Sequence, residues 1–165
     1  MLKDRYEDVL RRVGEAARRS GRRPEDIIVV AVTKKASMDL VRELFELGHR
    51  HFGENRVQQL AARAAQIEEY RERIDEHPVS SGRSAPDSPL WHMVGALQRN
   101  KVRKATETCR LIHSVDSLRL AEEIQIQSSK RDRVTEVLIE VNFGEVQKSG
   151  IAAPAVRHLV DQMGS

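Results

Sequence analysis

The sequence predicts an α/β protein built on a parallel sheet, and two features carry that prediction. One amphipathic helix is followed by five repeats of a strand and a helix, and this alternation favours parallel strands joined by helical crossovers. The strands are rich in Val, Ile and Leu on both faces, as in a sheet covered on both sides. An open doubly wound sheet and a β/α barrel both fit. The pattern alone favours the open sheet, because a complete barrel usually needs ~250 residues.

The first elements are defined by periodicity and by capping residues. Apolar residues at helical spacing predict a helix over 3–19. The apolar run IIVVAVT opens a strand predicted over 27–34. Ser37 and Gly48 are residue types expected at the N-cap and the C-cap of the next helix. The sequence HFGE then predicts a short strand over 51–54.

One segment interrupts the regular alternation. Residues 78–89, PVSSGRSAPDSP, contain three prolines and four serines, which predicts a loop insertion. The insertion is too short to separate two domains, so we expect residues 1–165 to form a single domain. The other predicted elements are helices over 55–72, 99–107, 117–129 and 152–163, and strands over 90–95, 111–115 and 136–142.

Composition excludes several classes of function. Charged residues make up 32% of the chain and the net charge is +3, with acidic and basic residues interleaved, so no nucleic-acid-binding stripe is expected. The single cysteine, Cys109, cannot form an internal disulfide. No apolar run approaches the ~20 residues of a membrane span, and the first residues lack the apolar core of a secretory signal. We therefore expect a cytoplasmic protein that binds neither membrane nor nucleic acid.

Each predicted strand ends in hydrogen-bonding groups, which matters because β/α proteins bind ligands at the carboxyl ends of their strands. The first strand ends in Lys34 and Lys35. A lysine lying along apolar neighbours favours the neutral amine, which is the nucleophile that forms Schiff bases with carbonyl groups. The alternative is a lysine that extends from the strand end to water. Alternation places Lys34 on the face of Val30 and Val32, but it does not say which lysine points into a site.

Five blocks of sequence resemble the pyridoxal phosphate homeostasis protein family, whose members are similar to the N-terminal barrel of alanine racemase. The blocks are AVTKK at 31–35, HFGEN at 51–55, WHMVGALQRNK at 91–101, HSVDS at 113–117 and VLIEVNFGEVQKSGI at 137–151. They follow the order and spacing of the family. The resemblance implies a β/α barrel in place of the open sheet, here with a leading helix and about five of the family's eight βα units.

The resemblance also implies a cofactor and the residues that hold it. Lys34 occupies the position that carries the Schiff base with pyridoxal 5′-phosphate, and Lys35 does not. Asn55 and His92 occupy strand ends that line the cofactor pocket, and Asn142 and Lys148 fall on a polar loop over it. No metal ligand and no catalytic residue are implied.

The function implied is the binding and handing over of pyridoxal phosphate within vitamin B6 homeostasis, with cofactor-dependent apoenzymes as possible recipients. Catalysis is not expected, because racemisation needs an acid–base group on each face of the substrate. Tyr6 and Tyr70 both fall on predicted helices. The alternatives are a truncated fragment that binds nothing, or the remnant of a pyridoxal phosphate-dependent amino-acid racemase.

The chain is expected to be truncated relative to the family, which continues for roughly another third of its length and supplies the last three strands. The resemblance implies that this further part holds the cofactor phosphate. The resemblance implies a monomer for full-length members, whereas a sheet of five strands leaves two open edges through which self-association is possible; we favour truncation over completion of the sheet by a partner.

Overall fold

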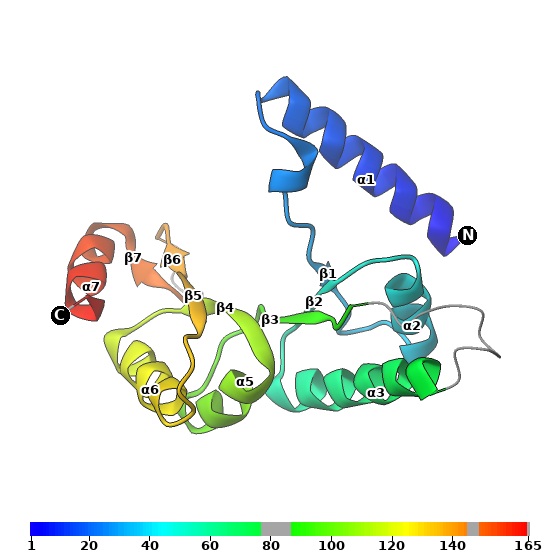
Figure 1. Cartoon of the computed structure of the whole chain (residues 1–165). Helices are drawn as coiled ribbons and strands as arrows, with labels where there is room; N and C mark the ends of the chain where they lie inside the picture. Colours follow the sequence, from blue (N-terminus) through cyan, green and yellow to red (C-terminus); the bar gives the residue numbers. More distant parts are fainter. Residues whose placement is uncertain (77–86, 145–148, 165) are drawn as a thin grey trace.

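The structure, a computed structural model, describes residues 1–76, 87–144 and 149–164 (Figure 1). The helices are α1 (Leu2–Arg19), α2 (Met38–Glu46), α3 (Val57–Glu76), α5 (Val102–Thr108), α6 (Leu118–Ser129) and α7 (Val156–Met163). The strands are β1 (Ala31–Val32), β2 (His51–Glu54), β3 (Leu90–Met93), β4 (Cys109–Val115), β5 (Glu136–Ile139), β6 (Val141–Asn142) and β7 (Ile151–Ala152). Three short 3-10 helices are η1 (Pro24–Asp26), η2 (Arg99–Lys101) and η3 (Ala153–Ala155).

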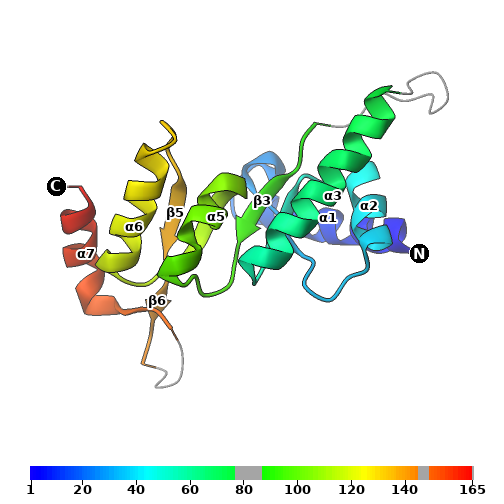
Figure 2. The ribbon, with the colours of Figure 1, turned by 90° about the horizontal axis from the view of Figure 1, so that it is seen from below.

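The main sheet has five parallel strands in the order β1-β2-β3-β4-β5. Every crossover therefore moves to the next strand in the same direction, and α3, α5 and α6 lie in a row along one side of the sheet (Figures 1 and 2). A doubly wound sheet reverses its strand order and carries helices on both faces. The preference for an open doubly wound sheet is therefore wrong, and the chain forms part of a β/α barrel.

The first strand is much shorter than the predicted strand over 27–34. Only Ala31 and Val32 pair with β2, opposite Phe52 and Gly53. Because β2 begins at His51, the residues before Val30 have no neighbouring strand with which to form backbone hydrogen bonds. They are therefore not part of the sheet. Polar turn residues begin directly after Thr33, whose amide still donates to the Gly53 carbonyl at 3.0 Å.

The predicted strand over 136–142 is divided into β5 and β6 at Glu140. The Glu140 amide donates to the Val115 carbonyl at 2.9 Å, and its carbonyl accepts from the Ile151 amide at 2.8 Å. The chain thus changes its partner from β4 to β7 at this residue, and β6 pairs in parallel with β7. The strand β7 lies at the start of the predicted last helix, where the sequence carried no strand signal.

The expected N-cap of α2, Ser37, is confirmed, whereas the C-cap is Leu47, the residue before the expected Gly48. The Ser37 hydroxyl accepts a hydrogen bond from the Leu40 amide at 3.4 Å. Gly48 has a φ of +93°, in the left-handed region that glycine adopts without strain. The helix therefore ends at Glu46, and the chain enters β2 at His51 after the short connection 47–50.

The two faces of the main sheet differ in composition. The helix-facing side carries the core, which includes Phe45, Phe52, Leu60, Ile67, Trp91, Met93, Val102, Ala105, Ile112 and Ile124. The other side, called the inner face here, carries Val32, Gly53, His92 and Leu138. Val32 and Leu138 are each 49% exposed, because no helix of the described chain covers this side. It corresponds to the interior wall of a barrel.

Helix α1 lies apart from the helix row, on the other side of the sheet, and contacts α2 (Figure 1). The Tyr6 hydroxyl lies 3.2 Å from His49 Nδ1, and the His49 ring meets Phe52 edge-on at 5.1 Å. Since His49 Nε2 lies 2.7 Å from the His51 carbonyl, which only accepts, Nε2 carries the proton and Nδ1 accepts from Tyr6. This contact ties α1 to the amino end of β2.

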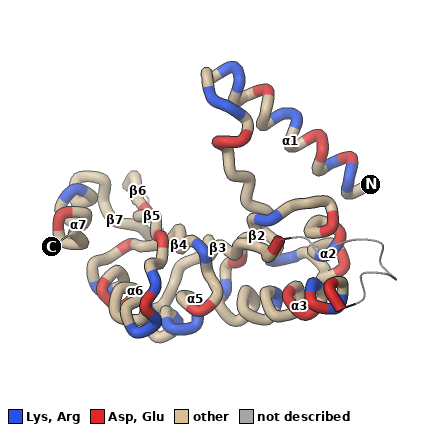
Figure 3. The backbone as a smooth tube through the Cα atoms, viewed as in Figure 1, with Lys and Arg blue, Asp and Glu red and all other residues tan. Residues whose placement is uncertain are grey.

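Charged residues of both signs alternate along α1 and α3 (Figure 3). The pairs on these helices are mostly i,i+3 and i,i+4 neighbours, such as Arg11 with Glu15 and Arg71 with Asp75. Exposed pairs of this kind contribute little to stability individually. Among the described residues, no helix combines the length and the apolarity that crossing a membrane requires.

Phe52→Ala tests the helix-facing core. Phe52 is fully buried and contacts both His49 and Trp91, so we expect its truncation to lower the free energy of unfolding by about 3–5 kcal/mol. Urea denaturation measures the change. The matched control is Phe143→Ala, since Phe143 is 87% exposed and the same substitution there should change stability very little. Equal effects of the two substitutions would contradict this assignment of the core.

Candidate functional site

The carboxyl ends of the five parallel strands meet at one edge of the sheet, and the structure places the site residues predicted from the sequence at or below it. Lys34 is exposed in the turn after β1, and Asn55 is half-buried directly after β2. Asn142 is half-buried in β6, and His92 lies inside β3. Lys148 lies outside the described residues. Lys34, Asn55 and Asn142 thus share one edge of the sheet, and His92 lies inside β3.

The residues two positions before Lys34 and Lys35 lie on opposite faces of the sheet. Val32, two residues before Lys34, lies on the inner face opposite Gly53, whereas Thr33 is buried toward the helices. Lys34 is thus the second residue after an inner-face position, and Lys35 is the second residue after a helix-facing one. Both lysine side chains are exposed in the turn.

Both predicted asparagines lie against a glycine that permits close backbone approach. A Cβ atom on Gly95 would lie 2.5 Å from the Asn55 carbonyl oxygen, a distance that no side chain tolerates. A Cβ atom on Gly150 would lie 2.9 Å from the Asn142 amide nitrogen. The Asn142 Oδ1 atom accepts a hydrogen bond from the Gly144 amide at 2.8 Å, which orients the side chain within its own loop. The backbone of each asparagine thus packs closely against the backbone of a glycine later in the sequence.

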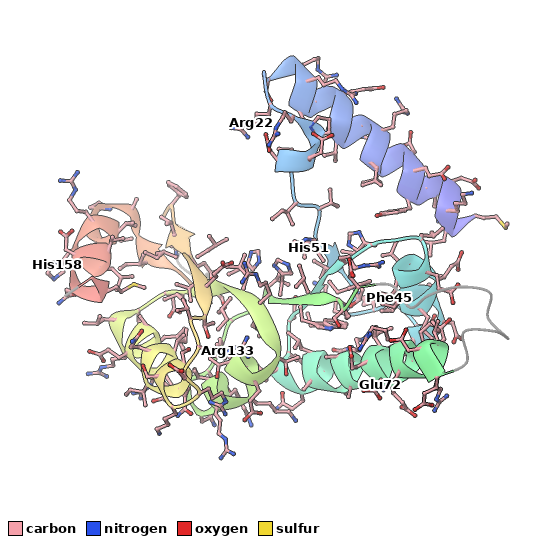
Figure 4. The ribbon with its side chains drawn as sticks, in the orientation of Figure 1. Arg22, Phe45, His51, Glu72, Arg133 and His158 are labelled. Atoms are coloured by element: carbon pink, nitrogen blue, oxygen red, sulfur yellow. The ribbon has the colours of Figure 1, made fainter. Side chains whose placement is uncertain are left out.

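His92 does not stand at a strand end as the resemblance implied, but joins two other histidines on the inner face. His92 Nε2 lies 2.9 Å from His51 Nδ1, and His92 Nδ1 lies 2.9 Å from His113 Nε2. The three residues come from adjacent strands, β2, β3 and β4. Figure 4 shows His51 on the side of the sheet away from α3. Both ring nitrogens of His92 are therefore already engaged within the protein.

The histidine row is a chain of neutral imidazoles. Burial, and then the neighbouring His113 and His51, lower the pKa of His92 from 6.5 to about 4. Burial also lowers the pKa of His51 and of His113. A neutral ring has one N–H donor and one bare acceptor nitrogen. The two hydrogen bonds therefore run in the same sense, either from His51 toward His113 or in reverse.

A buried ion pair lies on the other side of the sheet, directly beneath the Lys34 turn. Glu54 is fully buried at the end of β2, and its Oε1 atom lies 3.0 Å from Arg63 Nε of α3. The Thr33 hydroxyl donates to the same oxygen at 2.6 Å. Sequence reasoning missed this pair. Its signal was an arginine among the core positions Val57, Leu60 and Ile67 of an amphipathic helix, because a buried arginine requires a partner.

Tyr6, Tyr70 and Cys109 lie away from the Lys34 edge. Tyr6 bonds His49, and the Tyr70 hydroxyl donates to Glu46; both partners precede β2, at the amino end of the sheet. Cys109 is buried in β4, and burial raises the pKa of its thiol to about 12, so it stays protonated. The arrangement thus offers an exposed primary amine and two amide side chains at the strand ends.

The chain belongs by its fold to the β/α barrel class, with the exposed Lys34 after its first strand, and known proteins of this fold match it. Pyridoxal phosphate homeostasis proteins are 32% identical in Aquifex aeolicus, over 96% of this chain, and 33% identical in Pseudomonas aeruginosa, over 94%. PipY of Synechococcus elongatus, solved without pyridoxal phosphate, is 30% identical with a TM-score of 0.71 over 92% of this chain. PipY solved with pyridoxal phosphate bound has a TM-score of 0.68. No family model matches the chain.

The pyridoxal phosphate homeostasis proteins are thus homologues of this chain, and the resemblance of its five sequence blocks to that family is confirmed. The chain spans 62% of the length of both bacterial relatives and 63% of PipY. The similarity extends over nearly all of the chain, including α1.

The histidine row predicts a fall in stability on mild acidification. The unfolded chain binds protons at His92 below pH 6.5, whereas the folded chain does so only near pH 4. The stabilisation is therefore complete above pH 6.5 and is lost as the pH falls toward 4. We expect the free energy of unfolding to fall by about 2 kcal/mol between pH 7 and pH 5, as measured by urea denaturation.

Two substitutions separate His92 from other titrating groups. His92→Asn should flatten the pH dependence in this window, whatever its effect on stability at pH 7. His158→Asn removes an exposed histidine of α7 and should leave the slope unchanged. A wild-type stability that is equal at pH 7 and pH 5 would contradict the neutral histidine row.

Proposed function

We propose that this chain binds pyridoxal 5′-phosphate at the carboxyl ends of its strands, with Lys34 as the residue that attaches the cofactor. The observation that carries the proposal is the exposed Lys34 amine, which follows the inner-face residue Val32 at the end of β1. PipY, a structural neighbour with 29% identity, was solved with pyridoxal phosphate bound, which supports the choice of ligand.

The chemistry fits the residues present. The Lys34 nitrogen would form a C=N bond with the cofactor aldehyde, whose oxygen leaves as water, so that a Schiff base links the two. Asn55 and Asn142 would offer amide donors and acceptors at the same edge of the sheet, and Lys148 would add an ammonium donor. His92 would form the wall below the site, because its two nitrogens are engaged by His51 and His113. When bound, the cofactor supplies an electron sink to whatever amine it carries.

The biological role that we propose is cofactor homeostasis without catalysis. The relatives in Aquifex aeolicus and Pseudomonas aeruginosa are named pyridoxal phosphate homeostasis proteins. Racemisation would need an acid–base group facing Lys34 across the substrate. Tyr6 and Tyr70 lie at the opposite end of the sheet instead, which favours a binding protein over a racemase. The recipients would be pyridoxal phosphate-dependent apoenzymes in the cytoplasm.

Self-association through the sheet is a further part of this proposal. Strand β1 pairs on one side only, and Ile28 and Val32 are 61% and 49% exposed beside that edge. An unpaired apolar edge is a template for a second strand. A second copy of the chain would cover these residues.

Lys34→Ala tests the attachment site. Mixing the wild-type protein with pyridoxal phosphate should give an absorbance band at the edge of the visible range, because a Schiff base extends the conjugation of the ring. The band should be absent in Lys34→Ala and retained in Lys35→Ala, which removes an equally charged neighbour in the same turn. Borohydride reduction followed by peptide mass spectrometry locates the modified lysine.

Two outcomes would overturn the proposal. The wild-type protein, shown to be folded by a cooperative thermal transition, gives no band at all. Alternatively, Lys34→Ala gives a band of wild-type intensity, in which case the cofactor reacts with surface lysines in general.

A further inference from the structure

Helix α3 holds the backbone of the Lys34 turn at two points. Gln59 Nε2 donates to the Lys34 carbonyl at 3.2 Å, and one guanidinium nitrogen of Arg63 donates to the Ala36 carbonyl at 2.7 Å. Gln59 and Arg63 are four residues apart and therefore lie on the same face of the helix. The Ala36 amide donates to the Thr33 carbonyl at 2.8 Å, which closes the turn itself.

The Arg63 guanidinium connects three segments. Its Nε atom contacts Glu54 at the end of β2, one terminal nitrogen contacts the Ala36 carbonyl, and the other lies 3.8 Å from the Met38 sulfur at the start of α2. The planar fork of arginine makes such divergent contacts possible, whereas the single ammonium group of lysine does not. Arg63 thus links the strand next to β1 with the end of the turn that follows β1 and with the start of α2.

Glu54 anchors the arrangement from below. Its side chain is fully buried, and the Arg63 side chain is 10% exposed. The same oxygen of Glu54 accepts from Thr33, the residue directly before Lys34. Removing one partner of a buried ion pair leaves an uncompensated charge and is strongly destabilising, so the pair strongly favours a single arrangement.

We propose that Glu54, Gln59 and Arg63 are positioning residues for Lys34. They fix the backbone on both sides of Lys34 so that its exposed side chain leaves the turn toward the inner face, while the backbone of Lys35 lies between the two held carbonyls. None of the three touches the amine. The proposal rests on the proposed function for the importance of Lys34, but the hold on the turn is testable without any cofactor.

Hydrogen exchange of the Ala36 amide measures how stably the backbone of the Lys34 turn is fixed. In Arg63→Lys, which keeps the positive charge but loses the fork, we expect this amide to exchange at least about tenfold faster than in the wild type. The matched control is Arg73→Lys, a substitution of an exposed arginine on the same helix. Gln59→Ala should accelerate exchange in the turn to a smaller degree, and Gln66→Ala, at an exposed position of α3, should not.

Selective reaction with pyridoxal phosphate measures whether the fixed backbone makes Lys34 react in preference to Lys35. Wild-type protein is treated briefly with the cofactor and borohydride, and mass spectrometry gives the ratio of modification at Lys34 to that at Lys35. The ratio should exceed one in the wild type and fall toward one in Arg63→Lys and in Thr33→Val. Thr33→Ser retains the hydroxyl and should restore the wild-type ratio, which an effect of general instability would not do.

The outcomes separate the two proposals. A wild-type ratio of one overturns the role of Lys34, and the exchange measurement then decides whether the turn is held. A wild-type ratio above one that persists in Arg63→Lys, or an unchanged Ala36 exchange rate in that variant, overturns the positioning role. If Arg63→Lys does not fold, Thr33→Val and Gln59→Ala supply the same two comparisons with milder changes.

Discussion

The sidedness of the parallel sheet is the constraint on which the rest of the structure depends. Every crossover moves to the next strand in the same direction, so the crossover helices cover one face and the apolar core forms between them and the sheet. The carboxyl ends of the strands are then gathered at one edge. Polar residues that are far apart in the sequence, such as Lys34, Asn55 and Asn142, are brought to that edge by the strands that they follow or end. The inner face is not part of the apolar core and can therefore carry polar side chains.

Buried polar groups are accommodated differently on the two faces. On the helix-facing side, Glu54 and Arg63 balance each other's charge, and the remaining donors of Arg63 bond backbone and sulfur. On the inner face, His92 is buried without an opposite charge, so burial and its histidine neighbours keep it neutral. The first solution fixes geometry through charge-assisted hydrogen bonds. The second avoids charge and makes stability depend on pH.

The sequence predicted those features that arise locally. The N-cap Ser37 and the strand HFGE depend on neighbouring residues and were found where expected, and the expected C-cap Gly48 lies one residue beyond the C-cap Leu47. Features set by tertiary partners were not predictable. Residues 27–30 have strand-forming side chains but too little of β2 beside them, and β7 forms only because Glu140 offers its carbonyl. Likewise, a two-residue period could not choose between Lys34 and Lys35, because the choice depends on which face the helices cover.

The contrast between a fixed backbone and an exposed side chain has a consequence for the Lys34 site. Ordering a loop and its side chains is part of the cost of binding, and that cost is reduced when the backbone is ordered beforehand. Arg63 and Gln59 order the backbone of the turn in the protein itself, so a ligand has only the Lys34 side chain left to immobilise. An amine that must remain accessible to an incoming carbonyl cannot itself be packed. Rigidity has to come from the backbone beneath it, and the buried Glu54–Arg63 pair provides that rigidity from the side of the sheet where charge can be paired away from water.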